Sequence, residues 1–380
     1  MGGQGPDWSR IHQTESPGFW SLLLAVFSVP YGMGSRFRLW SYSRGLFKRK
    51  ILPGFVISVG NLTSGGTGKT PAVAMLARWA LGKGYRVAIL SRGYRGKYND
   101  KVLEVSDGNS IKAGPMETGD EPYLLANKLS RIPLIISKRR YLAGLFAHEK
   151  FGCDFFILDD GFQHLELKRD LDIVLIDAEN PFGNGHLLPQ GPLREPVSQL
   201  ARADAFILTR VGSHGHKAPD LLTGKFSSTP VFCANHMPSE IVFPCSNEAH
   251  EPGFIKGKPV LGFAGIARPE LFRETLVGLG ADVVYFKGFK DHYQFKSDDM
   301  HALIQAKKRV GARYILTTEK DWMRIASLDM VFPETAYLGV EFVLLSDHDR
   351  FFKIITDRVS EVTQAGQEND ENSYQTHPGP

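Results

Sequence analysis

The most informative segment of this 380-residue chain is Asn61-Leu62-Thr63-Ser64-Gly65-Gly66-Thr67-Gly68-Lys69-Thr70. A β-rich run, Phe55–Val59, precedes it, and a helix-length segment, 71–81, follows it. In such a strand–loop–helix unit, glycines allow successive backbone N–H groups and the helix N-terminus to face bound phosphates. We expect Lys69 to reach the β- and γ-phosphates of a nucleotide and Thr70 to ligate Mg²⁺. The residues predicted to bind the nucleotide are Asn61, Thr63, Ser64, Gly65, Gly66, Thr67, Gly68, Lys69 and Thr70.

The loop departs from the usual pattern GxxxxGK[ST] at one position, because Thr63 stands where the first glycine is expected. The intact Gly-Lys-Thr at its end still favours phosphate binding over a chance turn. Two other nucleotide-binding classes fit less well. An ATPase with a second lysine directly ahead of paired glycines would carry Lys at position 64, where this chain has Ser64. A GTPase would carry Asn-Lys-x-Asp, and the nearest candidate, 127–130, ends in Ser130.

Beyond the loop, short β-rich runs alternate with helix-length segments such as Arg140–Lys150, which predicts an α/β protein with a mainly parallel sheet. The expected strands of this first part are Phe55–Val59, Arg86–Leu90, Pro133–Ile136, Phe155–Leu158, Ile173–Ile176 and Ala205–Leu208. A segment rich in Gly, His, Lys and Ser, 211–225, interrupts the pattern, and the chain to about residue 257 reads as irregular. A second, smaller α/β lobe is predicted to follow, with a helix near Pro269–Leu279 and strands Val260–Ala264, Val283–Phe286 and Tyr314–Leu316.

The composition describes an ordinary globular protein that can bury a full core, at 42% hydrophobic residues and a net charge of +4. Three widely spaced cysteines indicate neither a disulfide framework nor a zinc site. The charge is uneven, because the stretch from Pro17 to Asn99 holds 13 Lys and Arg and not one Asp or Glu. Such a positive field suits phosphates or an anionic membrane surface.

The N-terminal apolar run, Gly18–Val29, is closed by Pro30 and covers about a dozen residues, whereas a spanning helix needs roughly 20. It is followed by a basic cluster interleaved with apolar residues, Arg36 to Lys50, which a secretory signal would not show. Two interpretations remain open from the residues alone. The segment is either an interfacial membrane anchor or a core helix followed by a surface helix.

A second chemical signal is the run Phe155–Leu158 followed by Asp159 and Asp160. In a parallel sheet, acids at the carboxyl end of a strand lie at the binding crevice. We expect the phosphate loop to lie beside them. This is where a Walker B ligand for Mg²⁺ belongs. The structural alternative is a strand followed by an Asp-Asp-Gly turn.

Weaker candidates lie elsewhere. Asp120, after Gly119, is predicted to cap a helix and could present a carboxylate at the cleft. Arg194 could clamp a phosphate, and Gln163, His164 and His292 are polar residues that taken singly indicate little. In the run 317–321, Thr318 and Asp321 predict a helix N-cap pair, and no chemistry is assigned to that run.

Taken in order, these motifs resemble the tetraacyldisaccharide 4′-kinase family of lipid A biosynthesis. The resemblance covers roughly residues 18–355 and rests on NLTSGGTGKTP, SRGYRG from Ser91, GDEP from Gly119, DDGFQH from Asp159, LLPQGPLREP from Leu187, FAGIARP from Phe263 and TTEKDW from Thr317. It implies a P-loop NTPase-like fold, ATP and Mg²⁺ as cofactors, and transfer of the γ-phosphate to the 4′-hydroxyl of a membrane-embedded disaccharide 1-phosphate. The family often has a second His where this chain has Tyr293.

The resemblance also implies roles for residues. Asp120 is then the base, with His292 orienting it, and Lys69 and Arg194 neutralise the transferred phosphate. The metal is held by Thr70, Glu121 and one or both of Asp159 and Asp160. The acceptor headgroup is expected to contact Ser91, Arg92, Tyr94, Arg95, Gln163 and His164.

The implied organisation is a membrane-associating segment (1–50), an ATP-binding kinase core (51–250), a smaller α/β lobe (257–360) and a disordered polar tail (365–380). The expected location is peripheral, on the cytoplasmic face of the bacterial inner membrane, with the lipid A disaccharide precursor and the membrane surface as partners. No nucleic acid and no protein partner are expected. Two other functions remain as alternatives: a P-loop kinase or ligase of a soluble metabolite, and a non-kinase ATP-dependent assembly protein.

Overall fold

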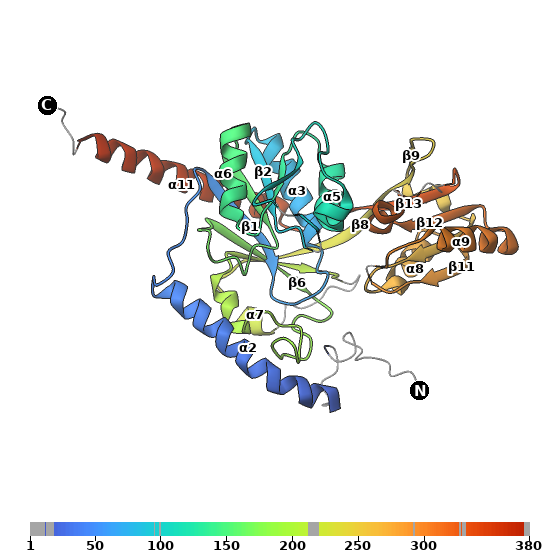
Figure 1. Cartoon of the computed structure of the whole chain (residues 1–380), viewed down its shortest axis with the longest axis horizontal. Coiled ribbons are helices and arrows are strands. Elements are labelled where there is room, and N and C mark those ends of the chain that lie inside the picture. The colour runs from blue at the N-terminus through green and yellow to red at the C-terminus, as the bar shows by residue number, and fades with distance from the viewer. Residues whose placement is uncertain are drawn as a thin grey trace.

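The computed structural model describes residues 12, 19–94, 96–98, 100–211, 220–291, 293–326, 328 and 332–375. Within this part, one 13-stranded sheet runs through the whole molecule in the order β11-β10-β12-β13-β8-β7-β6-β1-β5-β2-β4-β3, with β9 paired to β8 (Figure 1). Helices cover its faces. The α/β class predicted from the sequence is therefore confirmed.

The first half of the sheet is parallel except at its edge, where β3 runs antiparallel to β4. Its central strands are buried along their whole length, as strands covered on both faces must be. Alternate residues of β5 enter different cores: Phe155 and Ile157 pack beside α3, whereas Phe156 and Leu158 pack beside α6. The elements are β1 (Phe55–Asn61), α3 (Lys69–Gly82), β2 (Val87–Ser91), β3 (Leu103–Ser106), α4 (Pro115–Thr118), α5 (Asp120–Lys128), β4 (Leu134–Ile136), α6 (Arg140–Phe151), β5 (Phe155–Asp159), β6 (Leu171–Asp177), η1 (Val197–Arg202), β7 (Ala205–Thr209) and α7 (Asp220–Gly224).

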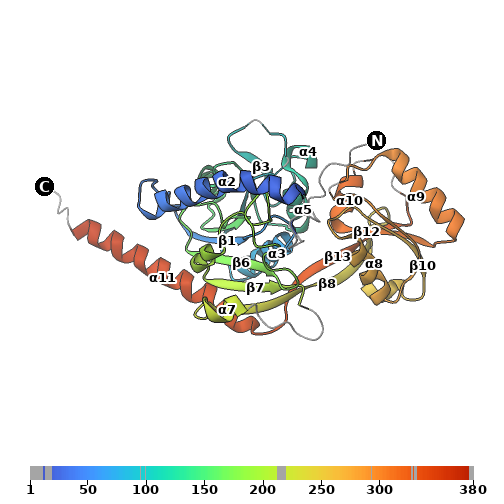
Figure 2. The same cartoon turned by 90° about the horizontal axis from the view of Figure 1, so that it is seen from below.

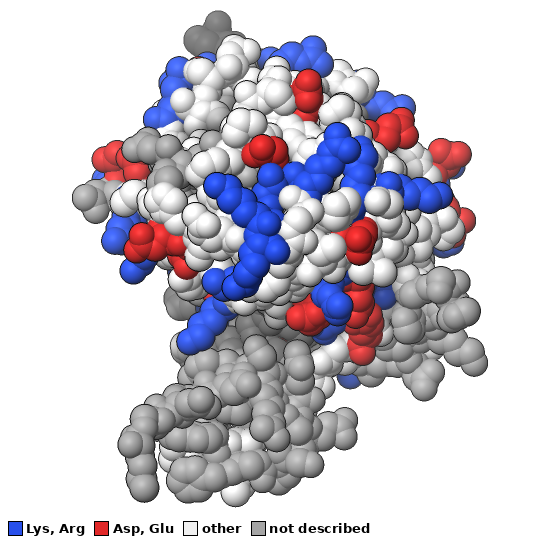
Figure 3. Space-filling view, turned by 90° about the vertical axis from the view of Figure 1, so that its right-hand side faces the viewer, with Lys and Arg blue, Asp and Glu red and all other residues white. Residues whose placement is uncertain are grey.

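The second half is a smaller parallel group, β11-β10-β12-β13, with its own cores. Figure 3 looks onto this end of the molecule and shows Lys and Arg side chains gathered in a band, so positive charge is not confined to the N-terminal quarter. The elements are β9 (Glu248–His250), η2 (Pro252–Ile255), β10 (Pro259–Ala264), α8 (Pro269–Gly278), β11 (Asp282–Gly288), α9 (Ser297–Val310), β12 (Tyr314–Thr318), α10 (Glu319–Ile325) and β13 (Thr335–Leu344).

The two halves are joined by a long antiparallel pair, β8 (Val231–Phe243) with β13. One end of β8 pairs with β7 and the other with β13 and β9, so a single strand lies in two different environments. The expectation of an irregular segment up to residue 257 is therefore wrong. No single alternation of polar and apolar residues can describe a strand that changes neighbours, and Pro238 further disguises it.

The last helix, α11 (His348–Gln375), returns to the first half, where Phe351, Phe352 and Ile355 join its core. The tail predicted to be disordered from residue 365 is helical to residue 375 (Figure 1). Helix propagation costs less than nucleation, so a helix whose first turns are docked can extend into a polar stretch of sequence.

The N-terminal helix α2 (Phe19–Ser43) lies along one face of the first half (Figure 2). It passes through Pro30 without ending. Polar contacts dock it: Ser28 Oγ donates to the backbone oxygen of Leu187, and Tyr31 Oη donates to that of Arg194. Arg38 bonds the buried carboxylate of Glu195 at 3.2 Å.

The outer face of α2 is apolar. Its exposed side chains recur at helical spacing and make one continuous stripe: Leu22, Val26, Val29, Met33, Phe37 and Trp40. In the described part of the chain, no helix is both long enough and apolar enough to cross a bilayer.

Candidate active site

Three parallel strands end beside one another at the centre of the first half. β1 lies between β5 and β6, β2 lies on the other side of β5, and the strands end at Asn61, Ser91 and Asp159. Ser91 Oγ donates a 3.1 Å hydrogen bond to Asp159 Oδ2. The carboxyl ends of adjacent parallel strands form the binding crevice of such sheets. The predicted phosphate loop and the predicted Walker B aspartates therefore share one edge.

The loop after β1 leads into α3, whose N-cap is Gly68 in the left-handed conformation at φ 85°. A Cβ at this position would clash with the imidazole of His236 from β8, so two separate constraints require glycine. Thr63, by contrast, forms an isolated β-bridge with Leu193, and its φ is not positive. An extended residue replaces the first glycine of the usual pattern because the loop is held here by pairing with segment 187–195.

Lys69 is the first residue of α3, and its side chain turns back under the loop. Its Nζ donates to Asn61 Oδ1 at 3.1 Å and lies 3.6 Å from Asp160 Oδ1. Arg194 approaches the same carboxylate from the other side, with Nη1 at 2.8 and 2.7 Å from its two oxygens. Burial by itself would raise the pKa of Asp160, but Lys69 and Arg194 lower that pKa to about 2. Asp160 is therefore an ionised acid balanced by two cations.

Asp159 has the opposite environment. Burial raises its pKa to about 7, and the nearby Glu121 and Asp160 carboxylates add to that rise. Its Oδ1 is buried and makes no hydrogen bond in the described structure. Arg140, also buried, lies near its backbone oxygen, and burial lowers the pKa of that guanidinium to about 10. A buried carboxylate oxygen without a donor is a position where a cation would be favourable.

Helix α5 brings two more acids to the cleft. Gly119, not Asp120, is its N-cap, so Asp120 is the first helical residue and the predicted capping role is wrong. Gly119 adopts φ 81°, which an aspartate at the cap would tolerate poorly. Each acid meets a cation from α10: Asp120 pairs with Arg324 at 2.8 Å, and Glu121 with Lys320 at 3.2 Å.

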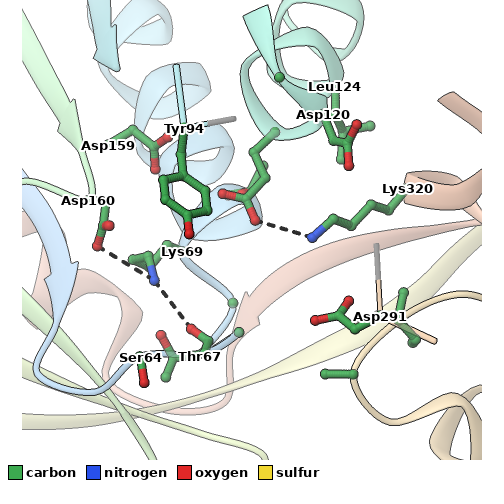
Figure 4. Close-up of a pocket in the computed structure, with 18 of the residues that line it drawn as sticks. Ser64, Thr67, Lys69, Tyr94, Asp120, Leu124, Asp159, Asp160, Asp291 and Lys320 are labelled. Carbon is green, nitrogen blue, oxygen red and sulfur yellow. Dashed lines mark hydrogen bonds and ion pairs between the residues drawn. The ribbon is translucent and has the colours of Figure 1, made fainter. Parts of the chain in front are cut away.

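The side chains face a cavity of about 2220 Å³ lined by both halves of the sheet and by α2. Figure 4 shows Asp159, Asp160 and Lys69 on one side of it, with Asp120 and Lys320 across from them. Asp291 of the second half faces the same space (Figure 4). Both halves of the sheet therefore contribute residues to one site.

The other residues predicted to contact the substrate differ in how exposed they are to the cavity. Arg92 and the 70% exposed Tyr94 lie at the cavity surface, whereas Ser91 is buried against Asp159. Gln163 Nε2 donates to the backbone oxygen of Asn61 at 2.9 Å, and burial lowers the pKa of His164 to about 3. His292 and Arg95 lie outside the described residues.

Sequence reasoning missed several polar residues of this cleft. Arg210 ion-pairs with Asp177 and donates to the backbone oxygen of Gly66 at 2.9 Å. Lys320 lies within the run 317–321, to which no chemistry was assigned, and Arg324 lies shortly after it. The sequence did indicate a helix that begins after Thr318 and carries Lys320 and Arg324 on one face. Only the fold shows which acids these two cations meet.

The donor set fits Mg²⁺. No group of three or more acidic, His or Cys side chains in the described residues forms a ready cage for a metal. Mg²⁺ is usually bound by one or two carboxylates together with phosphates and waters. Asp159, whose Oδ1 lies beside the phosphate loop without a hydrogen-bond partner among the described residues, can supply one of these carboxylates.

Comparisons with known proteins agree on one family. A family model described as tetraacyldisaccharide-1-P 4′-kinase (LpxK) matches residues 20–360. A tetraacyldisaccharide 4′-kinase of Syntrophus aciditrophicus is 41% identical over 331 residues, which is 84% of this chain and 88% of that relative. One of Geobacter metallireducens is 42% identical over 320 residues, 84% of this chain and 91% of that relative. A crystal structure of LpxK from Aquifex aeolicus in complex with ATP matches with a TM-score of 0.74 at 34% identity, covering 90% of this chain and 100% of that one.

Proposed function

Because this chain belongs to the tetraacyldisaccharide-1-P 4′-kinase family, we propose that its cleft moves the γ-phosphate of ATP onto the 4′-hydroxyl of a tetraacyldisaccharide 1-phosphate, a step of lipid A biosynthesis. The observation that carries this proposal is that a phosphate-binding loop and a carboxylate face each other across one cavity. The phosphate loop with Lys69 lies on one side and the carboxylate of Asp120 on the other (Figure 4).

The nucleotide is bound by residues 61–70. Backbone N–H groups of the loop and the N-terminus of α3 face the phosphates, and Lys69 contacts the β- and γ-phosphates. Arg194 enters the cleft 2.7 Å from Asp160 and reaches the γ-phosphate as charge develops there. Little covalent help is needed, because phosphoryl transfer depends mainly on alignment and charge neutralisation.

Thr70, Glu121, Asp159 and Asp160 are the residues that would hold Mg²⁺. The bound ion supplies neutralisation of the β- and γ-phosphate charge. Asp159 has an unsatisfied oxygen, and its pKa is raised by burial and by the neighbouring Glu121 and Asp160 carboxylates, an environment that a bound cation would stabilise. Ser91 orients this carboxylate through its hydrogen bond to Oδ2.

Asp120 is the base that accepts the proton of the acceptor hydroxyl. It starts α5 at the edge of the cavity, and its side chain is 19% exposed, which leaves it accessible to a substrate. By family resemblance His292 assists it. Arg92, Tyr94, Arg95, Gln163 and His164 are proposed contacts of the acceptor headgroup.

The acceptor is a lipid, and α2 offers a route from a membrane to the cleft. One side of α2 lines the cavity with Tyr31 and Arg38, while its apolar stripe faces outward. Basic residues that follow in sequence, Arg44, Lys48 and Arg49, would attract anionic headgroups. We therefore place the protein peripherally on the cytoplasmic face of the bacterial inner membrane, where ATP is available.

The test is transfer of labelled γ-phosphate from ATP to purified tetraacyldisaccharide 1-phosphate in mixed micelles. The expected product carries the label at the 4′-position and forms only with the lipid acceptor and Mg²⁺. Equal transfer to soluble sugars would favour the soluble-metabolite kinase. Hydrolysis of ATP without any acceptor phosphorylation would favour the assembly-protein alternative.

A further inference from the structure

Helices α5 and α10 lie side by side where the two halves of the sheet meet (Figure 2). Among the described residues, three ion pairs join them. The pairs are Asp120–Arg324 at 2.8 Å, Glu121–Lys320 at 3.2 Å and Lys128–Glu319 at 2.6 Å. In the first two pairs the acid lies at the start of α5 and the cation lies on α10, whereas in the third pair the lysine lies on α5 and the acid on α10. The two helices belong to different halves of the sheet. The arrangement joins the two halves at the residue proposed as the base.

Arg324 is the most constrained member of this set. Its side chain is 3% exposed, and its Nη1 donates to Asp321 Oδ1 at 2.7 Å and to the backbone oxygen of Gly265 at 2.9 Å. These acceptors belong to its own half of the molecule. They direct the remaining edge of the guanidinium, Nε and Nη2, toward Asp120 Oδ2, with 2.8 Å to each.

Asp321, which holds Arg324, is itself fixed. Its side chain is fully buried, and its Oδ2 accepts from Gly265 N and from Thr318 Oγ1, both at 2.8 Å. Thr318 in turn caps α10 by accepting from Asp321 N at 3.1 Å. The guanidinium is therefore aimed by a rigid local network before it meets Asp120, which is how a supporting side chain pre-organises another.

We propose that Arg324 is a positioning residue for phosphoryl transfer, holding the Asp120 carboxylate in the orientation that receives the acceptor proton. This inference rests on the proposed function, in which Asp120 is the base. Two donors on one oxygen restrict rotation of a carboxylate, and orientation of this kind contributes strongly to rate. Arg324 acts through Asp120, because its described contacts are with protein groups and its side chain is almost fully buried.

The test uses the full chain and compares Arg324→Ala, Arg324→Lys, Asp120→Ala and the double variant Arg324→Ala/Asp120→Ala. Arg324→Ala is expected to lower kcat about 10–100-fold with the KM for ATP within about twofold, since the loss is one of orientation. Arg324→Lys should recover only part of kcat, because an ammonium cannot reproduce the two-donor edge. Millimolar guanidinium should partly restore Arg324→Ala, an effect that a purely structural role would not show.

The matched control is Arg78→Ala, which removes a 3.5 Å ion pair between α3 and Glu341 of β13 outside the cleft and should leave kcat unchanged. The double variant should be no slower than Asp120→Ala. If Arg324→Ala slows the Asp120→Ala protein by the same factor as the parent, the role is structural and the inference is wrong. A parental kcat in both Arg324→Lys and Arg324→Ala also overturns the inference. A raised kcat in Arg324→Ala overturns it too, because the ion pair would then inhibit the reaction.

Failure of the proposed function gives a different pattern. If the parent does not phosphorylate the lipid, or if Asp120→Ala keeps the parental rate, then the base assignment falls and the positioning role falls with it. If Arg324→Ala does not fold, Arg324→Lys decides: a normal melting temperature with an unchanged kcat overturns the inference.

Discussion

Lys69 Nζ lies 3.6 Å from Asp160 Oδ1 and so joins the phosphate loop to the end of strand β5. The same carboxylate accepts both contacts of Arg194. In the proposed function, a triphosphate bound in the loop would compete with Asp160 for both cations, which would then lie near the group that develops charge in the reaction.

Replacing Lys69 by Ala should abolish nearly all transfer, lowering kcat by at least about 10²-fold, because the cation closest to the loop phosphates is lost. The measurement is kcat at saturating ATP, with a melting curve to show that the fold is retained. Lys83→Ala, an exposed lysine at the other end of α3, is the control and should behave as the parent. Activity of Lys69→Ala within a few-fold of the parent would contradict the phosphate-loop assignment.

Asp159→Asn should stabilise the protein in the absence of nucleotide and Mg²⁺. Folding raises the pKa of Asp159 from 3.8 to about 7, so the unfolded chain releases this proton at lower pH than the folded chain does. The parent therefore loses stability as the pH rises from about 4 to about 7, because the folded protein must then ionise a buried carboxyl group. The Asn variant has no such group and keeps its stability. The melting temperature of the variant should exceed that of the parent by at least about 3 °C at pH 8, and the gap should close toward pH 4.

The same variant gives a second reading with ligand present. Mg²⁺ and ATP should raise the melting temperature of the parent more than that of Asp159→Asn, because the variant lacks the anionic oxygen. A variant that is no more stable than the parent at pH 8 would show that Asp159 is not held against its preferred ionised state.

Asp120 and His292 should behave as one unit. Asp120→Ala is expected to lower kcat about 10²–10⁴-fold, as loss of a positioned base does, and the double variant should be little slower than Asp120→Ala. If the two residues acted independently, the fold-reductions in kcat of the two single variants would instead multiply in the double variant. Steady-state kcat for the parent, the two single variants and the double variant decides between these outcomes.

The stripe on α2 should determine membrane binding. Changing Leu22, Val26, Val29 and Met33 to Ser should weaken binding to anionic vesicles at least tenfold, since each exposed apolar side chain contributes about 1 kcal/mol when it enters the interface. Co-sedimentation measures this, and added salt should weaken the remaining, electrostatic part. Val277→Ser, an exposed apolar residue on α8, is the control. Unchanged binding by the α2 variant would mean that the anchor lies elsewhere.

Much of the fold was readable from the sequence, because its signals are local. The run at 55–59 became β1, the run at 155–158 became β5, and the helix at 140–150 became α6, each within about two residues at either end. Strand β8 was missed because its two ends pair with different neighbours. Strand β13 was missed too, and its pairing with β8 depends on residues about a hundred positions away.

The sequence by itself determined the local chemistry: a glycine-rich loop ending in Lys69 and a strand delivering Asp159 and Asp160, because backbone conformation and strand direction depend on neighbouring residues. Only the tertiary structure decided which charges meet. Asp120 and Arg324 are 204 residues apart, and their pairing exists because the β8–β13 ribbon brings α5 against α10. Ion pairing depends on distance in space and on burial, neither of which the order of residues records.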